Sequence, residues 1–202
     1  MMIKVIIFDL SGVCMPNAET IFAERYAREK GLDVKEFCKA FDELTASAER
    51  AEITGEECWR QLLGRFGLKD DPDKLVQEMF KDLKGNPEAL ELAQKLRKNH
   101  KTAFLTNYSK MHWDEIKKHI DFDKYFDFGI VAYQVKARKP EPPGFLAILK
   151  HFDAKPEEAV FLDDQAKNLA EAAKLGIKTV LFKNTKQLLQ DLKKLGVNID
   201  GT

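Results

Sequence analysis

Four short apolar runs constrain the fold more than any other feature of the sequence. The runs are Val5–Phe8, Ala103–Leu105, Ala159–Leu162 and Thr179–Phe182, and a weaker fifth run covers residues 128–132. Each run is continuous instead of alternating between apolar and polar residues, which is typical of strands buried on both faces of a parallel sheet.

Helical patterns separate these runs. Asn86 and Pro87 are suited to cap and begin one helix, and a second helix is expected from about Pro143. A third pattern ends before Gly176, a residue that commonly terminates helices. The alternation of strands and helices predicts an α/β fold with a doubly wound parallel sheet.

Residues 16–84 interrupt this alternation. They contain helical patterns but no convincing strand, and Thr54 with Glu57 fits a capping box that opens one of the helices. We therefore expect residues 1–15 and 85–202 to form the α/β core, with residues 16–84 inserted as an all-helical unit.

Charge and composition exclude several classes of partner. The 33 basic residues are matched by 33 acidic ones, so nothing favours nucleic acid or an anionic membrane as the main partner. No apolar run approaches the ~18 residues needed to cross a bilayer. The three cysteines have no metal-binding spacing, and reduced thiols in a cytoplasmic protein are the simplest interpretation. The sequence leaves open whether the protein is a monomer or a homodimer.

Three of the apolar runs end in polar residues that suggest a common site. Asp9 follows the first run, Thr106 the second, and Asp163 with Asp164 the third. In an open parallel sheet, ligands bind at the carboxyl ends of the strands, so these side chains are expected to converge. Close carboxylate pairs repel by roughly 4 kcal/mol at an effective dielectric near 20, and a bound cation relieves this repulsion. Hard oxygen ligands favour Mg²⁺. Taken singly, Asp9 could turn a loop and the aspartate pair could cap a helix.

These residues belong to four motifs that resemble the signatures of the haloacid dehalogenase-like (HAD) hydrolase superfamily. The motifs are Ile6–Val13, Phe104–Asn107, Arg138–Pro142 and Phe161–Asn168, in the order that the family shows. Within the superfamily, the sequence is most similar to small sugar-phosphate phosphatases and to the N-terminal half of soluble epoxide hydrolases. The helical insertion then corresponds to the cap that many members carry after the first motif.

The resemblance implies hydrolysis of a small phosphorylated metabolite by phosphoryl transfer to an aspartate. Asp9 would be the nucleophile, and Lys139 would place a positive charge on both Asp9 and the phosphate. Mg²⁺ would be held by Asp9, Asp164 and the backbone carbonyl of Ser11, with Asp163 in support. Thr106 and Asn107 would bind phosphate oxygens together with Lys139.

Ser11 departs from the family pattern. Most phosphatases of the family have an aspartate at this position, which protonates the leaving oxygen and later deprotonates the attacking water. A serine cannot do this, and loss of general acid–base help typically costs 10²–10⁴-fold in rate. The sequence thus predicts slow turnover of ordinary phosphomonoesters.

Two expectations concern the cap. Arg50 lies where capped members place a specificity loop, so it is expected either to reach a substrate anion or to pair with Glu49. The aromatic residues Phe22, Tyr26 and Trp59 are expected to form the cap core instead of lining a pocket.

Two other interpretations of the function stay open. A metal-independent dehalogenase would attack carbon, but such enzymes carry a tyrosine where Ser11 stands and lack the paired aspartates. A weakly active or non-catalytic binding protein is favoured by Ser11 and disfavoured by the presence of Asp9, Lys139 and Asp164.

Overall fold

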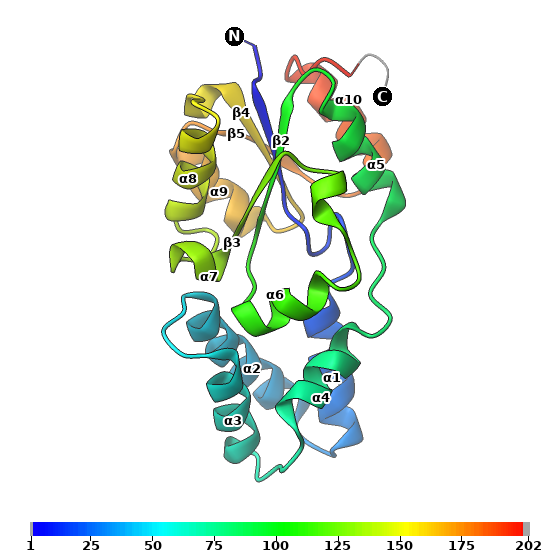
Figure 1. Cartoon of the computed structure of the whole chain (residues 1–202), viewed down its shortest axis with the longest axis vertical. Coiled ribbons are helices and arrows are strands. Elements are labelled where there is room, and N and C mark those ends of the chain that lie inside the picture. The colour runs from blue at the N-terminus through cyan, green and yellow to red at the C-terminus, as the bar shows by residue number, and fades with distance from the viewer. Residues whose placement is uncertain (1, 200–202) are drawn as a thin grey trace.

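Five parallel strands form the central sheet of the computed structural model, which describes residues 2–199 (Figure 1). In chain order they are β1 (Val5–Phe8), β2 (Lys101–Thr106), β3 (Phe128–Val131), β4 (Ala159–Asp163) and β5 (Lys178–Leu181). Their order across the sheet is β3-β2-β1-β4-β5, so β1 is central. The predicted doubly wound parallel sheet is confirmed, including the weaker fifth strand.

The two faces of the sheet bury alternate residues of each strand, because successive side chains in a strand point in opposite directions. Ile6 and Phe8 pack in the core that includes α5 (Pro87–Leu96) and α10 (Thr185–Lys194). Val5 and Ile7 pack on the opposite face, against α8 (Pro143–His151) and α9 (Ala166–Lys174). Figure 1 shows these two helix pairs on opposite sides of the sheet. This double coverage explains the continuously apolar strand sequences.

Four helices follow the first strand and lie together at one end of the molecule (Figure 1). They are α1 (Ala18–Glu29), α2 (Val34–Glu49), α3 (Gly55–Arg65) and α4 (Pro72–Phe80). The Thr54 side chain caps α3 by accepting a hydrogen bond from the Glu57 backbone N–H at 3.1 Å.

The cap has an aromatic core. Phe22, Tyr26 and Trp59 are each less than 5% exposed, and Phe37 and Phe41 complete the cluster. The expectation that these aromatic residues form the cap core is confirmed.

The chain enters and leaves the cap at adjacent points. The backbone N–H of Asn86 donates to the Cys14 carbonyl at 2.6 Å, and its side-chain amide donates to the Val13 carbonyl at 3.0 Å. These bonds join the outgoing and returning segments, and they support the proposed division into a core and a cap of residues 16–84.

The connections at the carboxyl ends of the strands contain shorter helices. After β2 comes α6 (Lys110–Ile116), followed by the 3₁₀ turn η1 (Phe122–Lys124). After β3 comes α7 (Ala132–Val135), and the turn η2 (Pro156–Glu158) precedes β4. Helix α6 contacts α3 and α4, so it joins the core to the cap.

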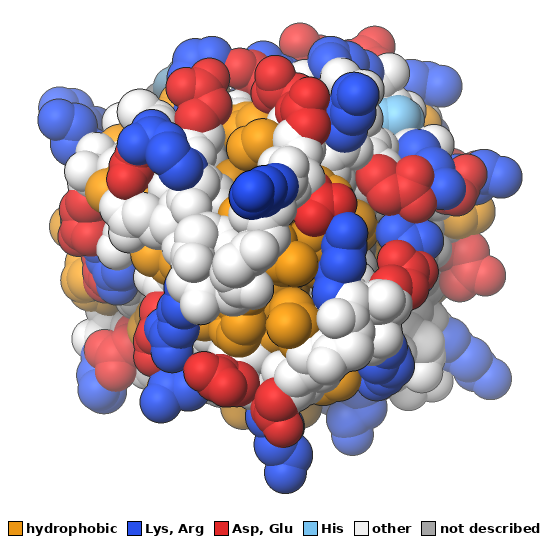
Figure 2. Space-filling view, turned by 90° about the horizontal axis from the view of Figure 1, so that it is seen from below, with side chains coloured by type: hydrophobic (Ala, Val, Ile, Leu, Met, Phe, Trp, Pro, Cys, Tyr) orange, Lys and Arg blue, Asp and Glu red, His pale blue; other side chains and the backbone are white. Residues whose placement is uncertain are grey.

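The surface of the cap end carries mixed charge. Figure 2 shows acidic and basic side chains intermingled over this end, with apolar atoms between them. Among the described residues, no helix has the length and apolar content needed to cross a bilayer.

Replacement of Phe145 by alanine tests the burial of α8 against the sheet. Phe145 is fully buried, and its ring meets that of Phe161 edge-on at 4.9 Å. We expect Phe145→Ala to lower the free energy of unfolding by about 3–5 kcal/mol in denaturant titrations. The matched control is Leu146→Ala on the same helix, because Leu146 is 50% exposed; we expect a change within about 0.5 kcal/mol. Equal losses in the two variants would contradict the described packing.

Candidate active site

Asp9 lies at the carboxyl end of the central strand and is 3% exposed. Its backbone N–H continues the pairing with β4 by donating to the Leu162 carbonyl at 2.8 Å. One carboxylate oxygen, Oδ1, accepts hydrogen bonds from the Leu10 N–H and from Lys139 Nζ, both at 2.6 Å. Asp9 is therefore fixed by its neighbours on both sides of the strand.

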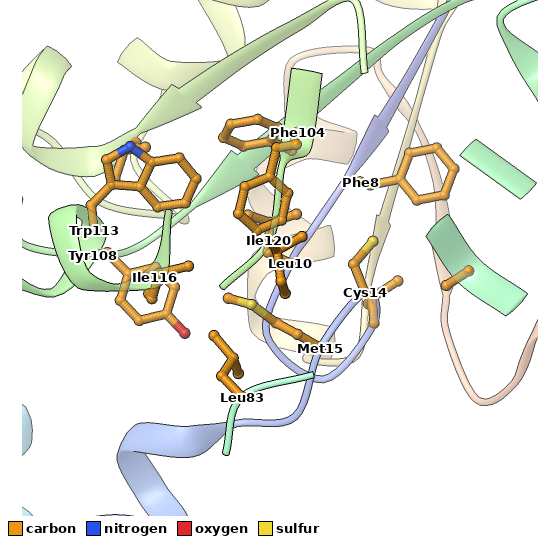
Figure 3. Close-up of a cluster of buried hydrophobic side chains, with 14 of the residues drawn as sticks. Phe8, Leu10, Cys14, Met15, Leu83, Phe104, Tyr108, Trp113, Ile116 and Ile120 are labelled. Carbon is orange, nitrogen blue, oxygen red and sulfur yellow. The ribbon is translucent and has the colours of Figure 1, made fainter. Parts of the chain in front are cut away.

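An apolar cluster holds the loop after Asp9 in place. Leu10 and Met15 point into this cluster from the loop, together with Tyr108, Ile116 and Leu83 from other parts of the chain (Figure 3). The Tyr108 hydroxyl forms a hydrogen bond with Ser11 Oγ at 2.6 Å. The predicted site position Ser11 thus has its side chain engaged with a buried tyrosine.

Gly12 allows the same loop to turn beside Asp164. Its φ of +80° is in the left-handed region that favours glycine. A Cβ atom at this position would lie 2.3 Å from Asp164 Oδ2, which is closer than van der Waals contact permits. The glycine therefore gives Asp164 its space next to the loop.

Lys139 is the cation of the site and is 5% exposed. Its Nζ lies 2.6 Å from Asp9 Oδ1 and 2.8 Å from Asp163 Oδ2. Burial alone would lower the pKa of Lys139, but the charges of Asp9 and Asp163 outweigh this effect and raise it. The lysine therefore keeps its charge in the buried site.

Asn107 holds the Lys139 backbone. Its Oδ1 accepts from the Lys139 N–H at 2.7 Å, and its Nδ2 donates to the Lys139 carbonyl at 3.2 Å. Both ends of the amide are engaged with the lysine, so the geometry favours a positioning role for Asn107 over direct contact with phosphate.

The two aspartates at the end of β4 differ in their surroundings. Asp163 is fully buried and accepts hydrogen bonds from Lys139 Nζ, from Asn168 Nδ2 and from the Gln165 N–H. Asp164 is exposed. These contacts give Asp163 a supporting role toward Lys139 and leave Asp164 open to a ligand.

The three carboxylates form a candidate cation site. One oxygen from each of Asp9, Asp163 and Asp164 lies within 4.8 Å of the others. Burial is the main cause that raises the pKa of Asp9 to about 7, with Lys139 opposing the rise and the other two aspartates adding to it. Burial, followed by the charge of Asp163, also raises the pKa of Asp164. A single lysine does not balance this negative charge, and the all-oxygen donor set fits a hard divalent cation such as Mg²⁺.

Thr106 carries a buried hydroxyl that needs a hydrogen-bond partner. Its side chain is 1% exposed, and its hydroxyl oxygen has no hydrogen-bond partner among the described residues. Buried polar groups in folded proteins are normally paired, so an unpaired hydroxyl beside a cavity indicates a place for a ligand.

A cavity of about 270 Å³ lies between the core and the cap. Asp9, Ser11, Thr106 and Lys139 line its core side. The cap side is polar as well, with Asn17, Glu19, Thr20, Asp42, Thr45 and Glu49 among its lining residues. The structure thus places predicted residues of three separate segments around one small polar cavity, whereas Asp163 and Asp164 of the fourth segment are not among its lining residues.

Arg50 is not among the residues around the cavity. Its guanidinium pairs with Glu141, with Nε donating to Oε1 at 2.9 Å, and it is not among the residues that line the cavity. Neither expectation for Arg50, contact with a substrate anion or pairing with Glu49, fits this arrangement. The reason is that Arg50 is the C-terminal cap of α2 and turns away from the cavity toward the core.

Arg138 and Glu49, which the sequence did not mark as site residues, line the cavity. Arg138 lines the cavity and forms an ion pair with the buried Glu49 at 2.7 Å. Burial raises the pKa of Glu49 to about 8, although Arg138 opposes the rise. Arg138 directly precedes Lys139 in the third motif, and this adjacency was the one available signal. No pattern in the sequence indicated Glu19.

Comparison with known proteins identifies the family of this chain. The family model described as haloacid dehalogenase-like hydrolase matches residues 3–176. The chain belongs to this family. Its central parallel sheet and flanking helices are the α/β core of that family.

Relatives and solved structures support the same assignment. Bifunctional epoxide hydrolase 2 of Sus scrofa is 29% identical over 96% of this chain, which spans only 39% of that relative's length. The phosphorylated carbohydrates phosphatase of Thermotoga maritima is 27% identical over 88% of this chain and 83% of its own length. A HAD family enzyme of Bacteroides thetaiotaomicron, solved as a magnesium complex, is 25% identical, with a TM-score of 0.74 over 91% of this chain and 94% of that chain.

Replacement of Gly12 by alanine tests the candidate cation site. The new methyl group would displace Asp164, so we expect Mg²⁺ affinity, measured by calorimetry, to fall roughly 10–100-fold, as when the surroundings of a metal ligand are disturbed. Gly31→Ala is the matched control, because Gly31 also has a positive φ of +67° but open space around its Cβ position. The control should lose stability without losing Mg²⁺ affinity. Unchanged affinity in Gly12→Ala would contradict a cation site at Asp164.

Proposed function

We propose that the protein is a magnesium-dependent phosphatase of small phosphomonoesters that uses Asp9 as its nucleophile. The observation that carries the proposal is the meeting of Asp9, Lys139 and the unpaired Thr106 hydroxyl at one cavity, beside a cluster of carboxylates. A carboxylate nucleophile, a fixed cation and a free donor are the groups that phosphoryl transfer requires.

The residues have distinct roles in this proposal. The Asp9 carboxylate attacks phosphorus, forming an aspartyl-phosphate, and water then hydrolyses this intermediate. Lys139 draws the anionic phosphate toward Asp9, and the Thr106 hydroxyl donates to a phosphate oxygen. Asn107 and Asp163 act on Lys139, the first through its backbone and the second through its ammonium group.

Asp9, Asp164 and the backbone carbonyl of Ser11 are the groups that would hold Mg²⁺, with Asp163 in support. When bound, the cation would offset the charge repulsion between the Asp9 carboxylate and an incoming phosphate. The raised pKa of Asp9, caused first by its burial, supports this role, because a nearby cation favours the ionised form needed for attack.

The cavity favours small polar substrates. Its volume of about 270 Å³ lies just below the range of roughly 300–1,000 Å³ that is usual for ligand pockets. Its cap side offers hydroxyl, amide and carboxylate groups suited to the hydroxyls of a small phosphorylated metabolite. The similarity to a phosphatase of phosphorylated carbohydrates supports the same substrate class.

The two alternative functions, a dehalogenase and a binding protein without activity, explain the site less well. A metal-independent dehalogenase has no use for the Asp164 carboxylate beside Asp9. A binding protein without activity does not require a carboxylate, a lysine and an unpaired hydroxyl to meet at one cavity.

A phosphatase screen tests the proposal. Purified protein is assayed for phosphate release from a panel of small phosphomonoesters, with Mg²⁺ or with a chelator. We expect Mg²⁺-dependent turnover in the wild-type protein and none above background in Asp9→Asn, because the amide cannot act as the nucleophile.

Two results would reject the proposal. Phosphate release that persists in Asp9→Asn would exclude this aspartate as the nucleophile. Halide release from 2-haloacids that continues in the presence of the chelator, with no phosphatase activity, would favour the dehalogenase instead.

A further inference from the structure

The proposed reaction needs a group that handles protons at the leaving oxygen, and Ser11 cannot supply it. The Ser11 hydroxyl is too weakly acidic, and it is already engaged with Tyr108 at 2.6 Å. Poor leaving groups, such as the alkoxides of sugars and polyols, depart slowly without protonation. Another carboxyl group in the cavity is therefore needed for this role.

Glu19, in the first turn of α1, is held at the cavity by a buried histidine. Its Oε1 lies 2.5 Å from Nδ1 of His112, which is 2% exposed. On the other side of the ring, Trp59 Nε1 lies 3.2 Å from His112 Nε2. Glu19 itself lines the cavity with 16% of its side chain exposed.

These contacts fix the tautomer of the histidine. The indole N–H of Trp59 can only donate, so His112 Nε2 must accept. A neutral His112 then carries its proton on Nδ1 and donates it to Glu19 Oε1. The His112 bond is the single side-chain hydrogen bond of Glu19 within residues 2–199, which leaves Oε2 available to the cavity.

Glu19 and Ser11 line the same cavity, together with Asp9. Two other cap carboxylates that line this cavity, Asp42 and Glu49, both pair with Arg138. Glu19 is held by His112 instead and forms no ion pair with an arginine or lysine among the described residues. It is therefore the cap carboxylate best placed to exchange a proton in the cavity.

We propose that Glu19 is the general acid and base of this enzyme and replaces the aspartate missing at position 11, with His112 and Trp59 as its positioning residues. The inference rests on the proposed phosphatase function. It also removes the reason for slow turnover that Ser11 alone suggested.

The proton steps balance as follows. Asp9 forms a bond to phosphorus while the bond to the leaving oxygen breaks, and protonated Glu19 gives its proton to that oxygen, releasing an alcohol. Glu19, now a carboxylate, takes a proton from the water that attacks the aspartyl-phosphate. The phosphorus–Asp9 bond then breaks, which restores the Asp9 carboxylate and protonated Glu19 and releases inorganic phosphate.

The test compares an alkyl with an aryl substrate. Glycerol 2-phosphate has a poor leaving group, whereas p-nitrophenyl phosphate releases a stabilised phenolate that needs little protonation. We expect Glu19→Gln to lower kcat/KM for the alkyl substrate by roughly 10²–10⁴-fold and to affect the aryl substrate far less. Ser11→Asp, added to Glu19→Gln, should restore part of the alkyl activity.

Control variants separate this role from a structural one. Glu29→Gln lies on the same helix and is exposed, so it should leave both activities unchanged. An equal fall on both substrates in Glu19→Gln, or a failure of Ser11→Asp to improve that variant on the alkyl substrate, would overturn the assignment. The assignment also fails if Glu49→Gln, and not Glu19→Gln, shows the selective loss.

Failure of the proposed function has a different signature. Wild-type protein inactive on both substrates, or activity that survives in Asp9→Asn, would reject the phosphatase itself. Wild-type activity that is lost in Asp9→Asn but is equally reduced on both substrates in Glu19→Gln would reject the role of Glu19 alone.

Discussion

The contact between Asp9 and Lys139 is the interaction on which the rest of the site depends. A carboxylate buried at the end of the central strand, with two others nearby, is costly unless a cation compensates it. Lys139 provides this compensation at 2.6 Å and is itself secured by Asp163 and by the amide of Asn107. Each of the four motifs therefore contributes to placing one ammonium group against one carboxylate.

The sheet topology explains why these distant segments meet. The order β3-β2-β1-β4-β5 puts β1 in the middle, with β2 on one side and β4 on the other. The connections from neighbouring strands diverge at this point, and a crevice forms at their carboxyl ends. Asp9, Thr106 and Asp164 stand at or next to the ends of these three adjacent strands. The cap then closes the crevice and brings Glu19 and Glu49 to its open side.

Two ion pairs join the end of α2 in the cap to the core. Glu49 of α2 pairs with Arg138, and the neighbouring Arg50 pairs with Glu141. Two successive cap residues of opposite charge thus pair with two core residues of opposite charge from a single loop. The reciprocal arrangement fixes the end of α2 at the rim of the cavity.

Local patterns predicted most of the fold, and tertiary packing determined what they missed. The strands were recognisable because burial on both faces leaves a continuously apolar run, as in Val5–Phe8. The site residues at strand ends were recognisable because parallel strands bring their carboxyl ends to one edge. The direction of the Arg50 side chain was not recognisable from the sequence. A shift of one residue at a helix end decides whether a side chain points into the cavity.

The role proposed for Glu19 could not be predicted from the sequence either. Its significance comes from His112, which lies 93 positions away along the chain, and from Trp59 on a third helix. No spacing in the sequence relates these residues. Only the packing of the cap on α6 brings them together.

The central claim is that Asp9, Thr106, Lys139 and Asp164 form a single site for a phosphate and a divalent cation. A crystal structure of the protein with beryllium fluoride and Mn²⁺ as a stand-in for Mg²⁺ tests this claim most directly. We predict beryllium bonded to the Asp9 carboxylate, fluorides near Thr106 and Lys139, and an anomalous signal from the cation between Asp9 and Asp164. A cation bound elsewhere, or an Asp9 carboxylate left unmodified at saturating beryllium fluoride, would contradict the account.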